Sequence, residues 1–457
     1  MSTPDPVHPT SVRLRVFSLN CWGIRYLSKH CAQRYTMIGD LLAKEQYDVV
    51  LLQEVWSEKD FDALRKKLAS SLPYGHYFKS GVIGSGLAIF SKHRIQDTFR
   101  YRYSLNGYPY MLNHGDWFGG KAVGMAVLNI GNTTAHFYVT HLHAEYSREK
   151  DSYLPHRVVQ AWELQHFIRY TSAEADLVVL AGDFNMHPMD LGNRLLRTYA
   201  DLRDAYVETP KFDGCEDGGT MIAENPNNDM VPPEKGIRID YILFKGSSRL
   251  ELHCESMSTT KGSVLDHAFP YSDHEALTAE LRLDRVAQDG VSQDGSNGMG
   301  PLARGSDRTA GKLAELVDIV TEARTEVKVG LHCAQGMCYT AARTGVMGLV
   351  LLLLELAIAA VPWLALGAPG PFPSVSFYLL GALCFLILLT TALLYLFYTM
   401  EIKSLQEAED QMRQAVGCLQ ERSPWRNTAA LNVMDALAGG KQVETWDFYS
   451  ENQQAEM

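Results

Sequence analysis

The chain has little positive charge for its size. Its 457 residues include 42 Lys and Arg against 53 Asp and Glu, which gives a formal net charge of −11. A protein that binds duplex nucleic acid needs a basic surface to neutralise phosphates, so this balance argues against a nucleic-acid substrate. The first ten residues are polar and Pro-rich, and they lack the apolar core of a secretory signal peptide.

Cysteine motifs are also missing. The eight cysteines are scattered, and none forms a Cys-x-x-Cys pair. Without a signal peptide, this pattern indicates reduced thiols rather than a disulfide framework. The sequence also lacks the Cys and His spacing of a zinc site.

Strand and helix patterns interleave over residues 12–283, after a flexible arm at 1–11. Short apolar or alternating runs predict strands, and stretches with a 3.6-residue period predict helices. The predicted strands cover 14–19, 47–54, 86–90, 122–128, 135–143, 177–180, 237–244 and 276–283, and the predicted helices 30–45, 60–72, 157–170 and 191–198. This order is typical of an α/β or α+β sandwich with its functional groups in the loops.

One stretch, residues 177–185, organises the rest of the chain. Its apolar run predicts a buried strand, Gly182 ends that strand, and Asp183 and Asn185 follow two residues apart. In an extended chain both side chains project to one side of the strand end. The carboxylate of Asp183 accepts hydrogen bonds and the side-chain amide of Asn185 donates them. At one strand end, the two suit a site that positions a water molecule against a phosphate. The alternative is an ordinary strand followed by an Asx turn.

Polar groups follow several other predicted strands. Each has a plain structural explanation, because a carboxylate after a strand is often a solvated terminus and a lone His is often a core residue. Together they supply hard oxygen ligands, carboxylates and histidines, a combination that suits metal-assisted phosphodiester hydrolysis. The set comprises Asn20, Glu54, His141, His143, Asp183, Asn185, Asp240, Asp273 and His274.

Glu54 and Asn20 are the expected metal ligands. Their oxygens are of the type that Mg²⁺ takes while it keeps waters and substrate phosphate in its other positions. A histidine near its normal pKa can deprotonate a water at neutral pH, and a carboxylate on its other ring nitrogen fixes the tautomer. The sequence therefore predicts a magnesium-dependent hydrolytic site.

The last third of the chain has a different composition. Residues 284–311 are rich in Gly, Ser, Asp and Gln and predict a flexible linker, and residues 312–343 form an amphipathic juxtamembrane segment. This segment either packs on the catalytic domain or lies in the lipid headgroups. Two apolar runs, about 344–366 and 376–400, are each long enough to cross a hydrocarbon core about 30 Å thick. With the linker between them, the catalytic part should be separable near Leu283.

Positive residues flank both apolar runs on the same side. Arg343 precedes the first run and Lys403 follows the second, while the turn at 367–374 carries no charge. By the positive-inside rule, the catalytic part and the tail at 401–457 both face the cytosol. Glu355 lies within the first apolar run. Three explanations for a carboxyl group at this place stay open: it is protonated, it pairs with a group across the hairpin, or it has a function.

The polar motifs occur in an order that resembles the endonuclease/exonuclease/phosphatase superfamily, which includes deoxyribonuclease I, abasic-site endonucleases and sphingomyelinases. The resemblance covers about 12–283 and rests on Asn20, the pair Gln53-Glu54, His141, and the runs Gly182-Asp-Phe-Asn185, Arg238-Ile-Asp-Tyr241 and Ser272-Asp-His274. It implies a four-layer sandwich of two mixed β-sheets flanked by helices, to which this chain adds a C-terminal two-helix transmembrane hairpin.

Finer features are similar to the neutral sphingomyelinases. They are Asn20-Cys-Trp-Gly23, Leu52-Gln-Glu-Val-Trp56, His141-Leu-His-Ala-Glu-Tyr146 and Asp183-Phe-Asn-Met-His-Pro188. The two-helix anchor resembles the smaller, magnesium-dependent type, which is anchored through its C-terminal part. The resemblance implies hydrolysis of sphingomyelin to ceramide and phosphocholine on an intracellular membrane such as the endoplasmic reticulum, with Mg²⁺, or Mn²⁺ in its place.

The resemblance also implies a role for each polar residue. Glu54 and Asn20 hold the metal, and His274 is the general base, held by Asp240. The remaining roles are water orientation and transition-state stabilisation by Asp183 and Asn185, phosphate binding by His141, and support of the site by Asp273.

Several alternatives stay open. One alternative is an enzyme of the same fold that acts on a lysophospholipid, such as lyso-platelet-activating factor, or on an inositol phosphate. An inositol phosphate would need more Lys and Arg around the site. The alternative from another class of protein is a membrane scaffold that has no catalytic turnover. The aromatic loop at 101–118 lies at the membrane interface, faces the choline cation or packs on itself. Two residues of this loop, Tyr110 and Trp117, are weak candidates for contact with the substrate, and so is Lys121, which follows the loop.

Overall fold

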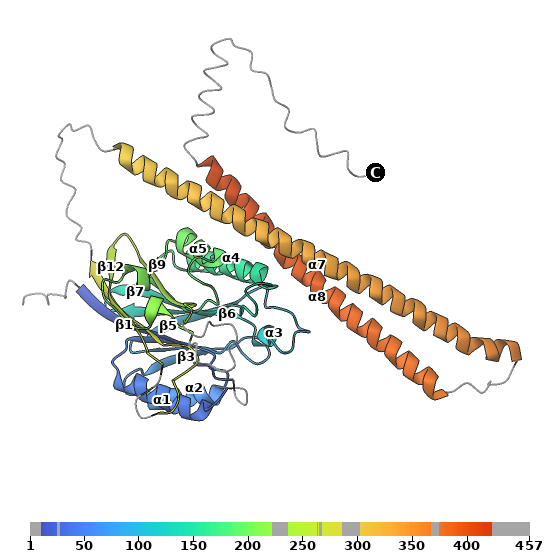
Figure 1. The fold of residues 1–457 in the computed structure, drawn as a ribbon. Coiled ribbons are helices and arrows are strands. Elements are labelled where there is room, and N and C mark those ends of the chain that lie inside the picture. Colours follow the sequence, from blue (N-terminus) through green and yellow to red (C-terminus); the bar gives the residue numbers. More distant parts are fainter. Residues whose placement is uncertain are drawn as a thin grey trace, which may run out of the picture.

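The computed structural model describes residues 11–24, 28–221, 236–262, 264, 267–285, 302–366 and 374–422. Two β-sheets pack face to face in the first part of the chain, and two long helices follow (Figure 1). Most of the predicted arm, part of the predicted linker and residues 423–457 of the predicted tail lie outside the described residues.

The first sheet has seven strands in the order β10-β12-β13-β1-β2-β4-β3. It is mixed, because β1 runs parallel to β2 and antiparallel to β13. Its strands are β1 (Ser11–Asn20), β2 (Val49–Gln53), β3 (Tyr74–Phe78), β4 (Leu87–Ser91), β10 (Phe212–Asp213), β12 (Leu250–Thr259) and β13 (Leu277–Arg285).

The second sheet has six strands in the order β5-β6-β7-β8-β11-β9. It is also mixed, because β8 runs parallel to β7 and antiparallel to β11. Its strands are β5 (Ile95–Arg102), β6 (Ala122–Ile130), β7 (Thr133–His141), β8 (Leu177–Asp183), β9 (Arg203–Asp204) and β11 (Asp240–Gly246).

Helices cover the outer faces of both sheets and confirm the predicted four layers. Helices α1 (Cys31–Lys44) and α2 (Glu58–Lys67) bury one apolar cluster against the first sheet. A second cluster fills the space between the sheets, and a third lies between the second sheet and the pair α4 and α5. The bounds of the remaining short helices and of this pair are α3 (Asp116–Gly119), α4 (Leu154–Thr171), α5 (Leu191–Tyr199) and α6 (Ala205–Glu208).

Five of the described strands were not predicted from the sequence, namely β3, β5, β12 and the two-residue strands β9 and β10. β5 is an edge strand whose residues are mostly exposed, so its apolar positions are too few to show a period. β12 alternates buried and exposed residues, but Glu, His and Ser on the exposed side masked the signal. β5 also includes the first two residues of the predicted aromatic loop, and α3 includes its last three.

The chain ends in two helices, α7 (Leu302–Leu366) and α8 (Ser374–Glu421), that run side by side (Figure 1). Both are apolar and long enough to cross a membrane, and most of their large apolar side chains at 346–358 and, among those described, at 375–400 are exposed. Such an exposed apolar surface makes both helices candidate membrane spans. The predicted linker differs from the structure over 302–311, because α7 begins at Leu302 and already includes these residues.

The amphipathic part of α7 packs on the catalytic domain. Its apolar face, with Ile319, Val320, Ala323 and Val327 buried, joins the cluster of α4 and α5. The part of α8 that follows its apolar run adds three further buried side chains, those of Leu405, Ala408 and Met412. Of the two readings of the juxtamembrane segment, packing on the domain is therefore confirmed, and the two helices form part of the second sheet's cover.

Candidate active site

Two parallel strands of the first sheet bring the expected metal ligands together. β1 and β2 pair in register from Val16 to Asn20, so Asn20 lies beside Gln53 and next to Glu54. Glu54 has a left-handed backbone with φ of 56°, which is strained for a residue other than Gly. Gly86 makes room for it, since a Cβ on Gly86 would lie 2.9 Å from the Glu54 Cα. The strand end is thus turned to aim the Glu54 carboxylate at the site.

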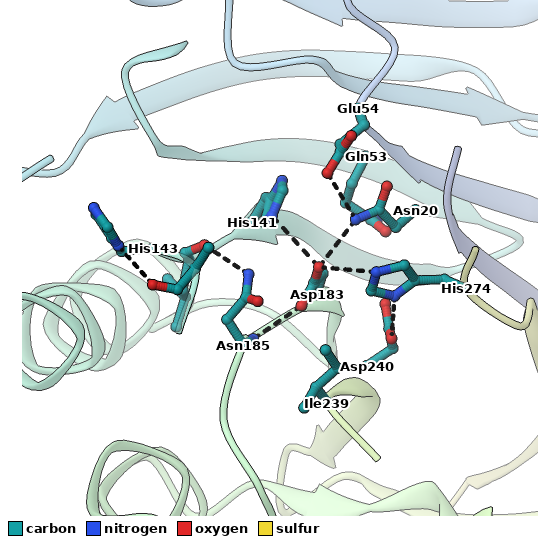
Figure 2. A network of polar contacts seen from close by, with 12 residues as sticks. Asn20, Gln53, Glu54, His141, His143, Asp183, Asn185, Ile239, Asp240 and His274 are labelled. Atoms are coloured by element: carbon teal, nitrogen blue, oxygen red, sulfur yellow. Dashed lines mark hydrogen bonds and ion pairs between the residues drawn. The ribbon is translucent and has the colours of Figure 1, made fainter. Parts of the chain in front are cut away.

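The second sheet supplies the facing groups. β8 ends at Asp183, which pairs in register with His141 of β7 on one side and with Asp240 of β11 on the other. Because the partners are fixed by backbone register, these three side chains reach the same edge of the sheet. His274 precedes β13 and approaches from the first sheet, so the site lies where the ends of both sheets meet (Figure 2).

Asp183 lies at the centre of a buried polar network (Figure 2). Its Oδ2 accepts a hydrogen bond from Asn20 Nδ2 at 2.9 Å and lies 3.4 Å from His141 Nε2. The same oxygen lies 3.8 Å from His274 Nε2. Asn20 Nδ2 also donates to Glu54 Oε1 at 3.1 Å, so this amide bridges the two carboxylates.

His274 is held by Asp240 as predicted. Its Nδ1 lies 2.8 Å from Asp240 Oδ2, and both side chains are buried. Two backbone amides and a hydroxyl fix this arrangement: Thr220 Oγ1 accepts from the amides of Ile239 and Asp240. With Nδ1 occupied, the free nitrogen of His274 is Nε2, which faces Asp183.

Asn185 departs from the extended geometry expected of it. Its φ of 49° turns the chain, and its backbone N–H donates to Asp183 Oδ1 at 2.9 Å. This is the Asx turn that was weighed as an alternative, and it lies inside the site. The Asn185 side-chain amide donates to the carbonyl of Leu142 at 3.0 Å, so its position is also fixed by the residue that follows β7.

Burial and mutual charge shift the pKa values of the network. Burial and the Asp240 charge raise the pKa of Asp183 to about 7. Burial alone would lower the pKa of His274, but the charges of Asp240 and Asp183 outweigh it and raise that pKa well above its usual value. Burial holds the pKa of His141 well below its usual value, and Lys121 lowers it further, so His141 is neutral.

The same groups fit a divalent cation. Burial, with the charge of Glu54 added, raises the pKa of Asp273 to about 6, so carboxylates gather here without enough positive charge. Asp183, Asp240 and His274 also place ligand atoms within 4.8 Å of one another. Since His274 Nδ1 is already paired with Asp240, the hard oxygens around Glu54 are the better cation donors. The donor set indicates a divalent metal site.

Lys121 lies near the same site, because its charge acts on His141 and Asp183. Its Nζ pairs with Asp116 Oδ1 at 3.0 Å, and both side chains are buried. Asp116 also accepts a hydrogen bond from the Tyr146 hydroxyl. The sequence analysis missed Asp116 and Tyr146, because a loop Asp next to aromatics carries no periodic signal.

Three predicted residues lie away from the Asp183 network. His143 stacks on Tyr153 at 4.0 Å between ring centroids, and Figure 2 shows it apart from Asp183. Tyr110 hydrogen-bonds to the hydroxyl of Tyr398 in α8 at 2.7 Å, and Trp117 packs edge-on against Phe118. The described contacts do not link either of these two aromatics to the catalytic groups.

Known proteins resemble the chain over most of its length. Residues 17–307 match the Endonuclease/Exonuclease/phosphatase family. The Sphingomyelin phosphodiesterase 2 of Mus musculus is 49% identical over 353 residues, 77% of this chain and 81% of the relative. The Sphingomyelin phosphodiesterase 2 of Homo sapiens is 45% identical over 414 residues, 90% of this chain and 93% of the relative.

Among solved structures, the crystal structure of beta toxin 275-280 from Staphylococcus aureus is similar with a TM-score of 0.48 and 18% identity. It covers 58% of this chain and 99% of its own. The family match extends over more than half of the present chain, and its residues include every group of the Asp183 network. The chain belongs to the endonuclease/exonuclease/phosphatase family.

Proposed function

We propose that this protein is a membrane-anchored phosphodiesterase that hydrolyses sphingomyelin to ceramide and phosphocholine. The observation that carries the proposal is the buried Asp240–His274 pair, whose free Nε2 faces Asp183 beside the Glu54 carboxylate. The two relatives named above, both called Sphingomyelin phosphodiesterase 2, support the choice of substrate. Because sphingomyelin is zwitterionic, an acidic protein binds it without a basic surface.

In the proposed reaction, His274 acts through Nε2. It takes a proton from a water whose oxygen bonds to the phosphorus, while the bond from phosphorus to the ceramide oxygen breaks. The leaving ceramide oxygen takes up a proton from solvent, and His274 then returns the proton it took to solvent. Asp240 stabilises the positive charge that His274 then carries. Asp183 and the Asn185 amide orient the water, neutral His141 donates to a phosphate oxygen, and Asp273 supports the site.

We further propose that the metal is Mg²⁺, with Mn²⁺ as a substitute. Glu54 and the oxygen of Asn20 would hold it, although Asn20 Oδ1 also accepts from the N–H of Trp22 and keeps one lone pair for a metal. The bound cation supplies charge neutralisation on the phosphoryl oxygens and offsets the carboxylates that raise the pKa of His274.

The proposed location is an intracellular membrane such as the endoplasmic reticulum, with both the catalytic domain and the C-terminus in the cytosol. Arg343 and Lys403 flank the two apolar runs, and the docking of α7 and α8 on the same domain supports a common side for both flanks. Tags at both termini, probed with protease after the plasma membrane alone is permeabilised, test this. Protection of either tag would contradict the hairpin.

Head-group release from defined lipids in detergent micelles tests the proposed function. We expect the full chain to release phosphocholine from sphingomyelin, and to lose this activity on chelation and regain it with Mg²⁺. Parallel arms with lyso-platelet-activating factor and inositol phosphates address the alternatives. Faster turnover of either of these would move the assignment to another substrate, and no turnover of any substrate would favour the scaffold.

A further inference from the structure

Two loops beside the candidate site expose large apolar side chains. Val82 and Ile83, in the loop between β3 and β4, are 74% and 54% exposed. Leu112, in the loop before α3, is 71% exposed. Single exposed apolar residues are ordinary on a protein surface. These three, however, are carried by loops that flank the same short helix, α3.

The loop of Val82 and Ile83 is fixed to α3 by its backbone. The amides of both residues donate to the carbonyl of Phe118, at 2.8 and 3.1 Å. Gly81 has φ of 57°, and a Cβ there would lie 2.4 Å from the carbonyl oxygen of Gly119, so the two backbones touch. The loop therefore holds the two side chains outward instead of letting them fold back.

The loop of Leu112 is fixed by aromatic neighbours. The ring of His114 stacks on Tyr146 at 3.7 Å between centroids, and the Tyr146 hydroxyl, which donates its proton to Asp116, also lies 2.5 Å from the His114 carbonyl oxygen. On the other side of Leu112, the hydroxyl of Tyr110 bonds to that of Tyr398. Leu112 thus lies between two anchored points, one at the site and one on α8.

These contacts fix the loops relative to the membrane. Tyr398 lies at the cytosolic end of the apolar run of α8, whose neighbouring Leu396 and Met400 are 59% and 65% exposed. Three residues further along α8, Glu401 pairs with His156 of α4 at 3.0 Å, and both side chains are buried. Figure 1 shows α3 and its loops on the side of the domain towards which the pair α7 and α8 extends.

We propose that Val82, Ile83 and Leu112 form a membrane-contact surface that enters the headgroup layer of the leaflet next to which α8 leaves the bilayer. The partner is a lipid surface, since the surface adjoins the end of the apolar run of α8 through Tyr110 and Tyr398. α3 links this surface to the site, because it begins with Asp116, the partner of Lys121. The surface brings the site to the leaflet, so a lipid phosphate reaches it without leaving the bilayer.

Kinetics on vesicles test the effect on turnover, a readout that rests on the proposed function. Val82→Ser with Ile83→Ser, and separately Leu112→Ser, are made in the full chain reconstituted in phosphatidylcholine–sphingomyelin vesicles. We expect the sphingomyelin fraction needed for half-maximal rate to rise on the order of tenfold. Turnover of a soluble short-chain sphingomyelin should stay unchanged. Val207→Ser is the matched control, because Val207 is 63% exposed on α6 and touches neither loop.

A direct measurement of depth does not require turnover. Ile83→Trp and Val207→Trp are compared with the unsubstituted chain in vesicles that contain lipid brominated on its acyl chains. We expect quenching of the added Trp at 83 and not at 207. Equal quenching at both positions, or vesicle kinetics unchanged in both Ser variants, would overturn the inference. A Ser variant that fails to fold would also lose turnover of the soluble substrate, and the quenching would then test the membrane contact. If the unsubstituted chain does not hydrolyse sphingomyelin, the proposed function fails, and the quenching still tests the membrane contact.

Discussion

At the scale of single residues, Asp183 connects the groups that the two sheets supply. It is contacted by Asn20 from β1, by His141 from β7 and by His274 from the segment before β13. Burial lowers the pKa of His274, but the charges of Asp240 and Asp183 outweigh it, so the groups of the network act on one another through their charges. Changes at one member are therefore expected to affect the others.

His274→Ala should lower the turnover of sphingomyelin by at least about 10² to 10⁴, since this is the usual contribution of a general base. Asp240→Asn keeps the shape but removes the charge, so it should also be severe. Because the pair acts as one unit, the double variant should be scarcely worse than His274→Ala. Losses that multiply would show independent roles. Near-normal turnover in His274→Ala would make His141 the next candidate for the base.

Glu54→Gln tests the metal ligand. The amide keeps the hydrogen bond with Asn20 but removes the anionic oxygen, so the Mg²⁺ concentration for half-maximal rate should rise while the fold survives. Glu58→Gln, an exposed position at the start of α2, is the control. An unchanged Mg²⁺ dependence in Glu54→Gln would remove Glu54 from the metal site.

Glu163 predicts a pH dependence of stability. Burial raises the pKa of this α4 carboxyl from 4.5 to about 7, against the opposing hydrogen bonds from Ser104. A raised folded-state pKa gives stability that is complete below about pH 4.5 and is lost as the pH rises through about 7. Glu163→Gln should therefore raise Tm relative to the unsubstituted chain more at pH 8 than at pH 5. A Tm difference that does not change with pH would contradict this.

At the scale of elements, α8 serves both the membrane and the catalytic domain. Besides the Glu401–His156 pair, Trp162 of α4 donates through Nε1 to Gln411 Oε1 at 3.0 Å. The Arg324 guanidinium pairs with Glu409 and joins α7 to α8. These contacts are spread along α8, so the helix is held against the domain over several turns.

Glu401→Leu should loosen this attachment. It removes one partner of a buried pair, a change that typically costs about 3–5 kcal/mol when a charge is left unpaired. We expect faster amide hydrogen exchange at the N-terminal turns of α4, and the shift should be absent in Glu407→Gln, an exposed position on the same helix. Unchanged exchange in Glu401→Leu would mean that the aromatic contacts alone hold α8.

At the scale of the whole molecule, the membrane helices complete the fold. Apolar side chains of α7 and α8 fill the third cluster, which α4 and α5 alone leave open on one side. Each fully buried aliphatic side chain contributes about 1.5–3 kcal/mol. The expectation that the domain separates cleanly near Leu283 is therefore revised, because that cut would expose this cluster.

A truncation series tests the revision. A chain that ends at Arg285 should bind a hydrophobic dye and melt well below the full chain, and a chain that ends at Arg343, which keeps the packed part of α7, should lie between them. Thermal unfolding in one detergent buffer gives the order. Equal Tm values for the shortest and the full chain would restore the separable domain.

The sequence by itself determined the layered fold and the identity of the network around Asp183. Alternating and apolar runs end in polar residues, and register then carries Asn20, His141, Asp183 and Asp240 to the same edge of their sheets. These signals are local, because strand period and turn residues act within a few positions. The same holds for the two apolar runs of α7 and α8, which length and composition identify.

Only the tertiary structure decided where distant segments meet. The Glu401–His156 contact joins side chains 245 residues apart, and the hydrogen bond from Trp162 to Gln411 joins side chains 249 residues apart. No periodicity encodes such pairs, since each partner looks like an ordinary loop or helix residue until packing removes it from water. For the same reason, the sequence left open whether α7 lies on the lipid or on the domain, and the packing of its apolar face against α4 and α5 answered it.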